Sequence, residues 1–346
     1  MAHGLTIAID AMGGDFAPDA VIEGAERARI AYPDLAFSFI GPAQRLEPLI
    51  AKHDGLRQAC TLLDVTEVVE AESKPSQAVR RGAKTSMGRA VAAVKAGEAA
   101  VAVSAGNTGA LMALAKVTLR TLEGIARPAL ASFIPTSHGD SVMLDLGANV
   151  ECDADNLVQF AIMGAAFART TLGLDTPSVG LLNVGVEELK GHGTVKTAAE
   201  QLKQTHLPMQ FAGFVEGDSI SRGDCDVIVT DGFTGNIALK TAEGTAKLIA
   251  RLMSEAFHAN WRSKLAYLMM RDSMNALKEY LDPNNHNGAV FLGLNGLVVK
   301  SHGGADANGI AAAIGVAADL ARADFIRLIR EDLARSPAAI AQGAAS

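Results

Sequence analysis

The amino-acid sequence predicts an α/β protein in which a mainly parallel sheet lies between two layers of helices. Short apolar runs alternate with longer helical patterns through most of the 346 residues, an order typical of parallel sheets covered on both faces. Hydrophobic residues make up 49% of the chain, which is enough for a large core. Aromatic residues make up only 5%, and a core of small aliphatic side chains suits helices packed closely on such a sheet.

The expected strands are short runs rich in apolar and β-branched residues. They cover residues 5–10, 36–40, 61–65, 99–104, 129–134, 141–146, 178–184, 209–215, 226–230 and 296–300. The expected helices cover residues 18–31, 85–96, 108–122, 155–172, 196–204, 236–258, 261–281 and 305–335. No shift in composition marks a domain boundary. We therefore expect one α/β domain over residues 1–336, a helical hairpin inserted at about 235–281, and a flexible Ala-rich tail at 337–346.

Charge, cysteine and motif patterns argue against several classes of protein. The net charge of −7 disfavours a nucleic-acid-binding protein. Cys60, Cys152 and Cys225 lie far apart, so we expect neither a zinc site nor a disulfide framework, and each should be a small buried side chain. The sequence lacks the His-Glu-x-x-His and Gly-x-Ser-x-Gly motifs, which disfavours a metalloenzyme and a triad hydrolase. With no signal peptide and no run of about 18 apolar residues, we expect a cytosolic protein.

Two loops that follow expected strands are candidates for ligand binding. Ligands of parallel sheets bind beyond the carboxyl ends of the strands. The first strand ends at Asp10 and runs into two glycines, which allow close approach to a ligand or form a plain tight turn: Gly13 and Gly14. The fourth strand ends in small and polar residues that open a helix: Ser104, Gly106, Asn107 and Thr108. The N–H groups at such a helix start bind anions, although the same residues also serve as ordinary helix caps.

Two later loops carry further candidate side chains. Lys190 and Lys196 flank glycines after the strand that ends near Asn183, where they either neutralise a phosphate or remain in solvent. Asp231 and Asn236 follow another apolar strand, where Asp231 either meets a ligand or caps the next helix.

The last expected strand ends with a lysine and a histidine. Lys300 and His302 are two residues apart, so we expect them to share one face of that strand. A glycine pair and a helix follow, which is the pattern of the other candidate loops.

Seven segments, in order, resemble the bacterial phosphate acyltransferases of phospholipid synthesis. They are residues 10–18 (DAMGGDFAP), 74–82 (KPSQAVRRG), 104–110 (SAGNTGA), 145–149 (DLGAN), 183–191 (NVGVEELKG), 226–236 (DVIVTDGFTGN) and 293–303 (GLNGLVVKSHG). The resemblance implies transfer of a fatty acyl group from an acyl carrier protein to inorganic phosphate, and the acyl phosphate would feed a membrane glycerol-3-phosphate acyltransferase. It also implies a fold related to isocitrate and isopropylmalate dehydrogenases and to phosphate acetyltransferase, and a homodimer with no metal and no nicotinamide cofactor.

Given this resemblance, we expect the loops after the strands to contribute different side chains to the reaction. We expect the loop from Ser104 to Thr108 to bind phosphate together with Lys190 and Lys196. Lys300 and His302 are candidates for stabilising the oxyanion or the leaving thiolate. Asp10, Asp231 and Asn236 are expected to orient these groups.

The expected hairpin carries apolar residues at helical spacing and more basic than acidic residues. Such a hairpin can lie on an anionic membrane, or its apolar stripes can pack on each other or across a dimer interface. The family resemblance favours membrane contact for the residues near the tip: Leu252, Phe257, Trp261, Lys264, Leu265 and Leu268.

A second basic cluster consists of Arg80, Arg81, Lys84 and Arg89. Acyl carrier proteins are acidic, so this cluster is a candidate docking surface, or else an ordinary solvated face. Three alternative functions remain open: a short-chain phosphate acyltransferase that uses coenzyme A, a decarboxylating dehydrogenase on the same fold, and a non-catalytic adaptor.

Overall fold

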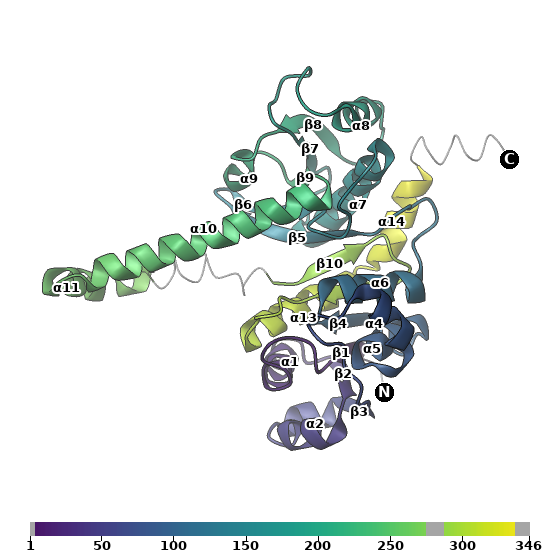
Figure 1. Ribbon diagram of the computed structural model, residues 1–346, viewed down its shortest axis with the longest axis vertical. Helices are drawn as coiled ribbons and strands as arrows, with labels where there is room; N and C mark the ends of the chain where they lie inside the picture. Colours follow the sequence, from purple (N-terminus) through teal and green to yellow (C-terminus); the bar gives the residue numbers. More distant parts are fainter. Residues whose placement is uncertain (1–3, 275–286, 336–346) are drawn as a thin grey trace.

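The computed structural model describes residues 4–274 and 287–335, and Figure 1 shows the arrangement of their elements. The strands are β1 (Leu5–Asp10), β2 (Leu35–Gly41), β3 (Cys60–Asp64), β4 (Val101–Ser104), β5 (Ala129–Thr136), β6 (Gly139–Leu144), β7 (Ser178–Leu182), β8 (Gln210–Val215), β9 (Val227–Val229), β10 (Ala289–Leu292) and β11 (Leu297–Lys300). The helices are α1 (Asp19–Ala31), α2 (Ala43–Ile50), α3 (Asp54–Gln58), α4 (Pro75–Arg81), the 3-10 helix η1 (Gly82–Lys84), α5 (Ser86–Lys95), α6 (Thr108–Leu119), α7 (Ala154–Leu172), α8 (Gly193–Lys203), α9 (Ser219–Arg222), α10 (Gly232–His258), α11 (Trp261–Met269), α13 (Ala307–Arg322) and α14 (Phe325–Ala334).

Within the described residues, eleven strands form one sheet in the order β3-β2-β1-β4-β11-β10-β5-β6-β9-β7-β8. Two parallel groups, β3 to β11 and β6 to β8, are joined by β10 and β5, whose pairings are antiparallel. The predicted mainly parallel sheet is therefore confirmed. The sequence pattern does not predict β10.

The core lies on both faces of the sheet. Ile7 and Ile9 of β1 belong to one hydrophobic cluster with residues of α1, α7 and α13, and Ala8 between them belongs to a second cluster with residues of α5 and α6. Alternate residues of a strand point to opposite faces, so each strand contributes to both clusters. This arrangement confirms the three layers expected from the sequence.

Two predicted helices are wrong in extent. The helix expected at 261–281 already ends at Met269, within the described residues. The segment 305–335 forms two helices, α13 and α14, rather than one. The break lies at Asp324, whose φ of 49° is left-handed and cannot continue an α-helix. The pattern also does not predict α2, α3 and α4, which are short.

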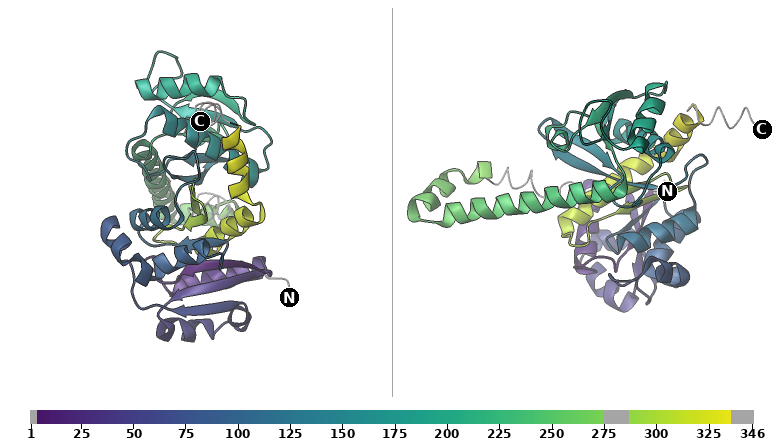
Figure 2. Two further views of the ribbon diagram at one scale, coloured as in Figure 1. Left: turned by 90° about the vertical axis from the view of Figure 1, so that its right-hand side faces the viewer. Right: turned by 45° about the horizontal axis from the view of Figure 1, so that its top comes forward.

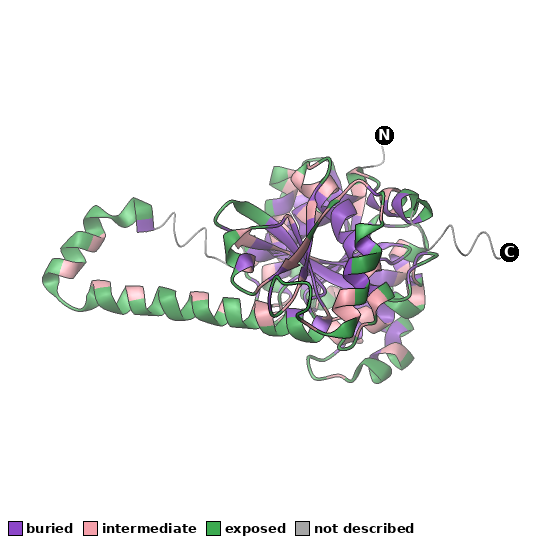
Figure 3. Ribbon diagram, turned by 90° about the horizontal axis from the view of Figure 1, so that it is seen from above, coloured by how far each residue is buried: buried purple, intermediate pink, exposed green. Residues whose placement is uncertain are grey.

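A helical hairpin projects from the body, as Figure 2 shows. Helix α10 has 27 residues and is therefore about 40 Å long, and α11 turns back beside its outer end. The rings of Phe257 and Tyr267 join the two arms at a centroid distance of 5.4 Å. In Figure 3 the hairpin is almost entirely exposed, and only Gly232 and Gly235 of α10 are buried. The expected hairpin is confirmed over its described part, whereas residues 275–281 and the tail 337–346 lie outside the described residues.

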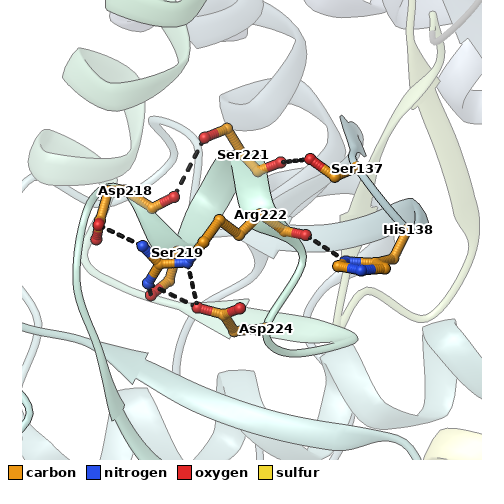
Figure 4. A network of polar contacts seen from close by, with 7 residues as sticks. All are labelled: Ser137, His138, Asp218, Ser219, Ser221, Arg222 and Asp224. Atoms are coloured by element: carbon orange, nitrogen blue, oxygen red, sulfur yellow. Dashed lines mark hydrogen bonds and ion pairs between the residues drawn. The ribbon is translucent and has the colours of Figure 1, made fainter.

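The turn between β5 and β6 is fastened to α9, as Figure 4 shows. The backbone N–H of Ser137 donates to the carbonyl of Ser221 at 3.0 Å. Nδ1 of His138 donates to the carbonyl of Arg222 at 2.7 Å, and Asp224 holds the Arg222 guanidinium at 2.8 Å. These bonds fasten the turn between β5 and β6 to the segment that connects β8 with β9.

None of the described helices combines the length and the apolar character that a membrane span requires.

Candidate active site

The carboxyl ends of β1, β4 and β11 lie side by side at one edge of the sheet, because the three strands are parallel neighbours. Each strand ends in a buried polar residue: Asp10, Ser104 and Lys300. Oγ of Ser104 donates to Oδ2 of Asp10 at 2.7 Å and accepts from the N–H of Gly106 at 3.1 Å. The structure therefore joins residues from three distant parts of the sequence in one group.

Lys300 is an amine buried at the end of β11. Its Nζ donates to the carbonyl of Ala105 at 3.3 Å and to that of Ser301. Burial first, and then the charge of Lys240, lower the pKa of Lys300 to about 8, while Asp10 and Asp15 act in the opposite direction. Near neutral pH, Lys300 is thus a cation that can lose its proton readily.

Asp10 is a buried carboxyl with hydroxyl groups around it. Burial raises the pKa of Asp10, and the hydroxyls of Ser86 and Ser104 act against this rise. Ser86 Oγ is fully buried, and within the described residues it is the one buried side-chain oxygen or nitrogen without a hydrogen bond of good geometry. The sequence analysis does not single out Ser86, because a serine at a helix start looks like an ordinary cap.

Glycines allow the three strand ends to meet. A Cβ added at Gly13 would lie 2.6 Å from the N of Gly106 and 2.8 Å from Oδ2 of Asp10. Gly14 has a φ of 104°, which favours glycine. The N–H of Asp15 then donates to the carbonyl of Gly303 at 2.8 Å. The glycine pair thus lets one stretch of backbone approach another, and the close approach to a ligand that the sequence predicts stays a prediction.

The start of α6 lies beside this group. Oδ1 of Asn107 accepts from the N–H of Ala110 at 2.9 Å, so Asn107 is the N-cap, which is the alternative the sequence left open. Its Nδ2 donates to the carbonyl of Ala71 at 2.5 Å. The N–H groups of Thr108 and Gly109 precede the first bonds of the helix and can meet an anion.

His302 follows β11 in a different environment from Lys300. It is exposed, whereas Lys300 is buried, and β11 ends at Lys300, so the alternation of strand residues on which the predicted shared face depends does not extend to His302. Nδ1 of His302 accepts from the N–H of Gly304 at 3.2 Å, and the neutral ring therefore carries its proton on Nε2. Partial burial and the charges of Lys240, Lys300 and Lys247 lower the pKa of His302, and Glu243 opposes them.

The loop after β7 forms a separate group. Nδ2 of Asn183 donates to the carbonyls of Gly185 and Lys190. Glu187 holds Nζ of Lys190 at 2.9 Å and raises its pKa, and Nζ of Lys196 donates to a carbonyl of the same loop. In the described part of the chain, no hydrogen bond or ion pair joins this loop to Asp10, Ser104 or Lys300. In the sheet, β7 is six strands from β4.

The start of α10 is fixed by two aspartates. Asp231 accepts from the N–H of Thr234 at 2.8 Å and so serves as the N-cap. The buried Asp145 accepts five hydrogen bonds from the loops around it, and its partner Asn149 accepts from the N–H of Gly232 at 2.7 Å. Asn236 is exposed, and its side chain stands beside Gly147. Asp145 and Asn149 are absent from the predicted site, although their motif directly follows an expected strand.

The predicted docking cluster is exposed on α4, η1 and α5. Within it, Arg81 pairs with Glu67 at 2.9 Å. A Cβ added at Gly109 would lie 3.2 Å from the ring of Pro75, so the first residue of α4 packs on the start of α6. The cluster is therefore connected to the candidate anion site through one short helix.

Most of the residues predicted for membrane contact are exposed: Leu252, Trp261, Lys264, Leu265 and Leu268, with Phe257 half-buried.

The cysteines are free, but Cys60 and Cys152 are half-buried, so the prediction of full burial is correct only for Cys225. Among residues 4–274 and 287–335, no group of three or more His, Cys, Asp or Glu side chains is arranged to hold a metal ion.

Known proteins resemble this chain over almost its whole length. Residues 5–328 match the fatty acid synthesis protein family. The phosphate acyltransferase of Rhodospirillum centenum is 55% identical over 346 residues, covering 100% of this chain and 98% of that protein. The phosphate acyltransferase of Paramagnetospirillum magneticum is 52% identical over 349 residues, covering 99% of each chain.

Solved structures share the fold at low sequence identity. A phosphotransacetylase from Streptococcus pyogenes has a TM-score of 0.62 at 19% identity, covering 93% of this chain and 95% of that one. A 4-hydroxythreonine-4-phosphate dehydrogenase from Klebsiella pneumoniae has a TM-score of 0.51 at 14% identity, covering 92% and 98%. The α/β class predicted from the sequence is thus confirmed by both architecture and neighbours.

Proposed function

The chain belongs to the fatty acid synthesis protein family, and on this premise we propose that it transfers a long-chain fatty acyl group from an acyl-carrier-protein thioester to inorganic phosphate. It is a phosphate acyltransferase, as are its full-length relatives. The proposal adds the identity of the acyl donor and of the product. The product would be an acyl phosphate for use by a downstream glycerol-3-phosphate acyltransferase.

The reaction needs positioning more than it needs a strong base. An oxygen of hydrogen phosphate attacks the thioester carbonyl carbon, a C–O bond forms, and the C–S bond then breaks. The proton of the phosphate passes to the departing thiolate, so the products are the acyl phosphate and the free carrier thiol. Because phosphate is already an anion, orientation and charge stabilisation can supply most of the rate enhancement.

The observation that carries this proposal is the meeting of three strand ends around a buried lysine. Lys300 supplies positive charge beside the N–H groups at the start of α6. Asp10 and Ser104 hold the loops in place through their 2.7 Å hydrogen bond. His302, with its proton on Nε2, can donate to the developing oxyanion or to the leaving sulfur.

On the second parallel group, we assign substrate-binding roles to the loop after β7 and to the start of α10. The loop supplies Asn183 and Lys190, and the helix that follows it, α8, supplies Lys196; both lysines would add positive charge near the carboxyl end of β7. Asp231 and Asn236, at the start of α10, would orient the catalytic lysine and histidine. The positive charge of the two lysines is what supports the assignment.

We further assign the carrier-protein docking surface to the basic cluster of Arg80, Arg81, Lys84 and Arg89. Its charge is opposite to that of an acidic carrier protein, and α4 leads directly from it to the start of α6. A carrier bound there could extend its thioester arm toward Thr108.

The exposed hairpin is assigned to assembly and membrane contact. Several large apolar side chains are exposed on this hairpin, whose helices Figure 3 shows to be almost entirely exposed, and such a concentration is unusual on an ordinary protein surface. We propose that part of this surface packs in a homodimer and that the tip touches the membrane. The protein would therefore lie in the cytoplasm and associate with the membrane from that side.

One assay separates this function from its alternatives. The protein is incubated with phosphate and either acyl carrier protein or coenzyme A carrying the same acyl group, and release of free thiol is followed. Phosphate-dependent release from the carrier protein is expected. Faster release from coenzyme A would favour a short-chain enzyme, and no release from either donor would favour an adaptor. Thermal stabilisation by nicotinamide nucleotides would instead favour a dehydrogenase.

A further inference from the structure

A groove with an apolar floor lies between α13 and the start of the β5–β6 pair. It consists of two adjoining cavities with volumes of about 400 Å³ and 430 Å³. The two cavities share part of their lining, so they form one continuous groove: Phe133, Asp140, Val316 and Asp319. Volumes of this size are typical of sites that bind small molecules.

The floor of the groove is apolar and firmly supported. Phe133 of β5 and Val316 of α13 are partly buried and pack on the hydrophobic core. The ring of Phe133 also stacks on that of the buried Phe167, at a centroid distance of 5.3 Å. Ala312 lines the first cavity and Leu172 lines the second. A floor that is already in place suits an apolar ligand, because few side chains have to be ordered on binding.

The charged groups of the groove stand at its rim. Asp140 is exposed, and the side chain of Asp319 is 57% exposed and lies 3.7 Å from the guanidinium of Arg322. In the second cavity, the hydroxyl of Thr171 donates to the carbonyl of Phe167 at 2.8 Å. The two carboxylates therefore keep their contact with water, and the floor is left to an apolar ligand.

The first cavity is connected to the candidate active site through Asn287. This side chain is 7% exposed and lines the cavity. Its Oδ1 accepts from the N–H of His302 at 2.9 Å, and its Nδ2 donates to Oγ of Ser301 at 2.8 Å. The wall of the groove is thus hydrogen-bonded to His302 and to the residue that directly follows Lys300.

The sheet register places the groove at the edge where β11 ends. Lys300 of β11 pairs with Ala289 at the start of β10. Strand β10 is paired in turn with β5, and Phe133 lies beyond the last of these pairs, toward the same edge. Because neighbouring strands are about 4.8 Å apart, β5 lies about 10 Å from β11. Helix α13 lies against the start of β10 (Figure 1), where a Cβ added at Gly288 would be 3.0 Å from the Cα of Ala313.

We propose that this groove binds the hydrocarbon chain of the fatty acyl group while the thioester carbonyl lies beside His302. The inference rests on the proposed function and adds a site for the chain. The chain would enter the first cavity at Asn287, and only a long chain would reach the second. Each methylene that leaves water contributes up to about fourfold in affinity, so binding should strengthen with chain length until the groove is full.

Two substitutions fill the groove at different depths. Ala312→Trp fills the first cavity, and Thr171→Trp fills the second, which Asn287 does not line. The kinetic constant kcat/KM is measured with hexadecanoyl, octanoyl and butanoyl groups on acyl carrier protein, and the two longer donors are compared with the butanoyl donor. Ala312→Trp should lower both ratios about tenfold or more, whereas Thr171→Trp should lower only the hexadecanoyl ratio.

Ala51→Trp is the matched control, because Ala51 is an exposed alanine at the end of α2, outside the groove. Both of its ratios should stay within about twofold of the wild type. The inference is overturned if the hexadecanoyl ratio of Ala312→Trp also stays within twofold, or if Ala51→Trp lowers that ratio equally. Should circular dichroism show that Ala312→Trp does not fold, Ala312→Leu replaces it and is judged in the same way.

A second readout does not depend on turnover. Binding of radiolabelled hexadecanoic acid to the full chain is measured by equilibrium dialysis without phosphate. Ala312→Trp should weaken this binding about tenfold or more, because the chain loses its place on the floor, and Ala51→Trp should leave it unchanged. Should the wild type make no acyl phosphate, the proposed function fails. In that case the inference stands if binding weakens in Ala312→Trp and not in Ala51→Trp, and equal binding by the two variants overturns it.

Discussion

The hydroxyl of Ser104 donates a 2.7 Å hydrogen bond to the carboxyl of Asp10, and this bond joins the ends of two neighbouring strands. Both residues are 2% exposed, so the carboxyl depends on protein partners rather than on water. The same hydroxyl accepts from the N–H of Gly106, which fixes the loop that opens α6. The pair therefore organises the candidate site without needing to touch the substrate.

Ser104→Ala should lower kcat/KM for phosphate by about 10- to 100-fold and cost about 1–3 kcal/mol of unfolding free energy, because a buried carboxyl loses a donor. Steady-state kinetics and urea unfolding measure the two effects. Ser76→Ala, at an exposed position of α4, is the control. Wild-type activity in Ser104→Ala would show that the Asp10–Ser104 pair does not organise the site.

Gly13→Ala should reduce activity more than it reduces stability. The added methyl would press on Gly106 and on the Asp10 carboxyl, and it would push apart the loops that follow β1 and β4. Gly217→Ala is the matched control, because its added Cβ meets no atom within 4 Å and its φ is not positive. We expect a loss of about tenfold or more in kcat/KM for Gly13→Ala only, since small displacements at a site are costly. Equal activity of the two variants would contradict this packing.

The pH dependence should report Lys300. Its pKa is lowered to about 8 by burial and by Lys240, and raised by Asp10 and Asp15. If the protonated amine of Lys300 binds phosphate, kcat/KM calculated on the concentration of phosphate dianion falls as pH rises through about 8, because the amine then loses its charge. In Lys240→Met the fall should move to higher pH, because removing a like charge raises the pKa of Lys300. If kcat/KM instead rises with pH over this range, the neutral amine is the active form.

Asp145→Ala should destabilise the protein by about 3–5 kcal/mol, because it leaves several buried donors without an acceptor. Urea unfolding followed by circular dichroism measures the change. Asp175→Ala, on an exposed turn, should change stability by less than about 0.5 kcal/mol. A loss below about 1 kcal/mol for Asp145→Ala would argue against its role in fixing α10.

Replacing Trp261 and Leu268 with serine should reduce recovery of the protein with anionic liposomes by about tenfold or more, because each buried apolar side chain is worth about 1.5–3 kcal/mol. Both residues are exposed near the tip of the hairpin. The control is Val117→Ser, an exposed apolar residue on α6. Equal flotation of wild type and double variant, or of the wild type with and without anionic lipid, would count against membrane contact.

The sequence predicts the first strand with its boundaries and the loops that end β1, β4 and β11. This is possible because each buried strand is a continuous apolar run that stops at a polar residue. By contrast, the roles of Asn107 and Asp231 cannot be decided from sequence, since the residues that cap helices also bind ligands.

Lys240 shows the other limit of sequence reasoning. In the sequence it is an ordinary lysine on a helix surface, and its effect on the pKa of Lys300 arises only when two groups of strands fold into one sheet. Ser86 and Asp145 are similar, because their importance comes from partners that the chain order does not reveal.

The most direct test of the proposed reaction uses acyl-carrier protein and radiolabelled inorganic phosphate, with the product trapped by hydroxylamine. The wild type should incorporate label into an acyl phosphate in a one-to-one ratio with free carrier thiol, and Lys300→Met should lose nearly all of this activity while remaining folded. Thiol release without labelled acyl phosphate, or full labelling by Lys300→Met, would contradict a phosphate site built around the buried lysine.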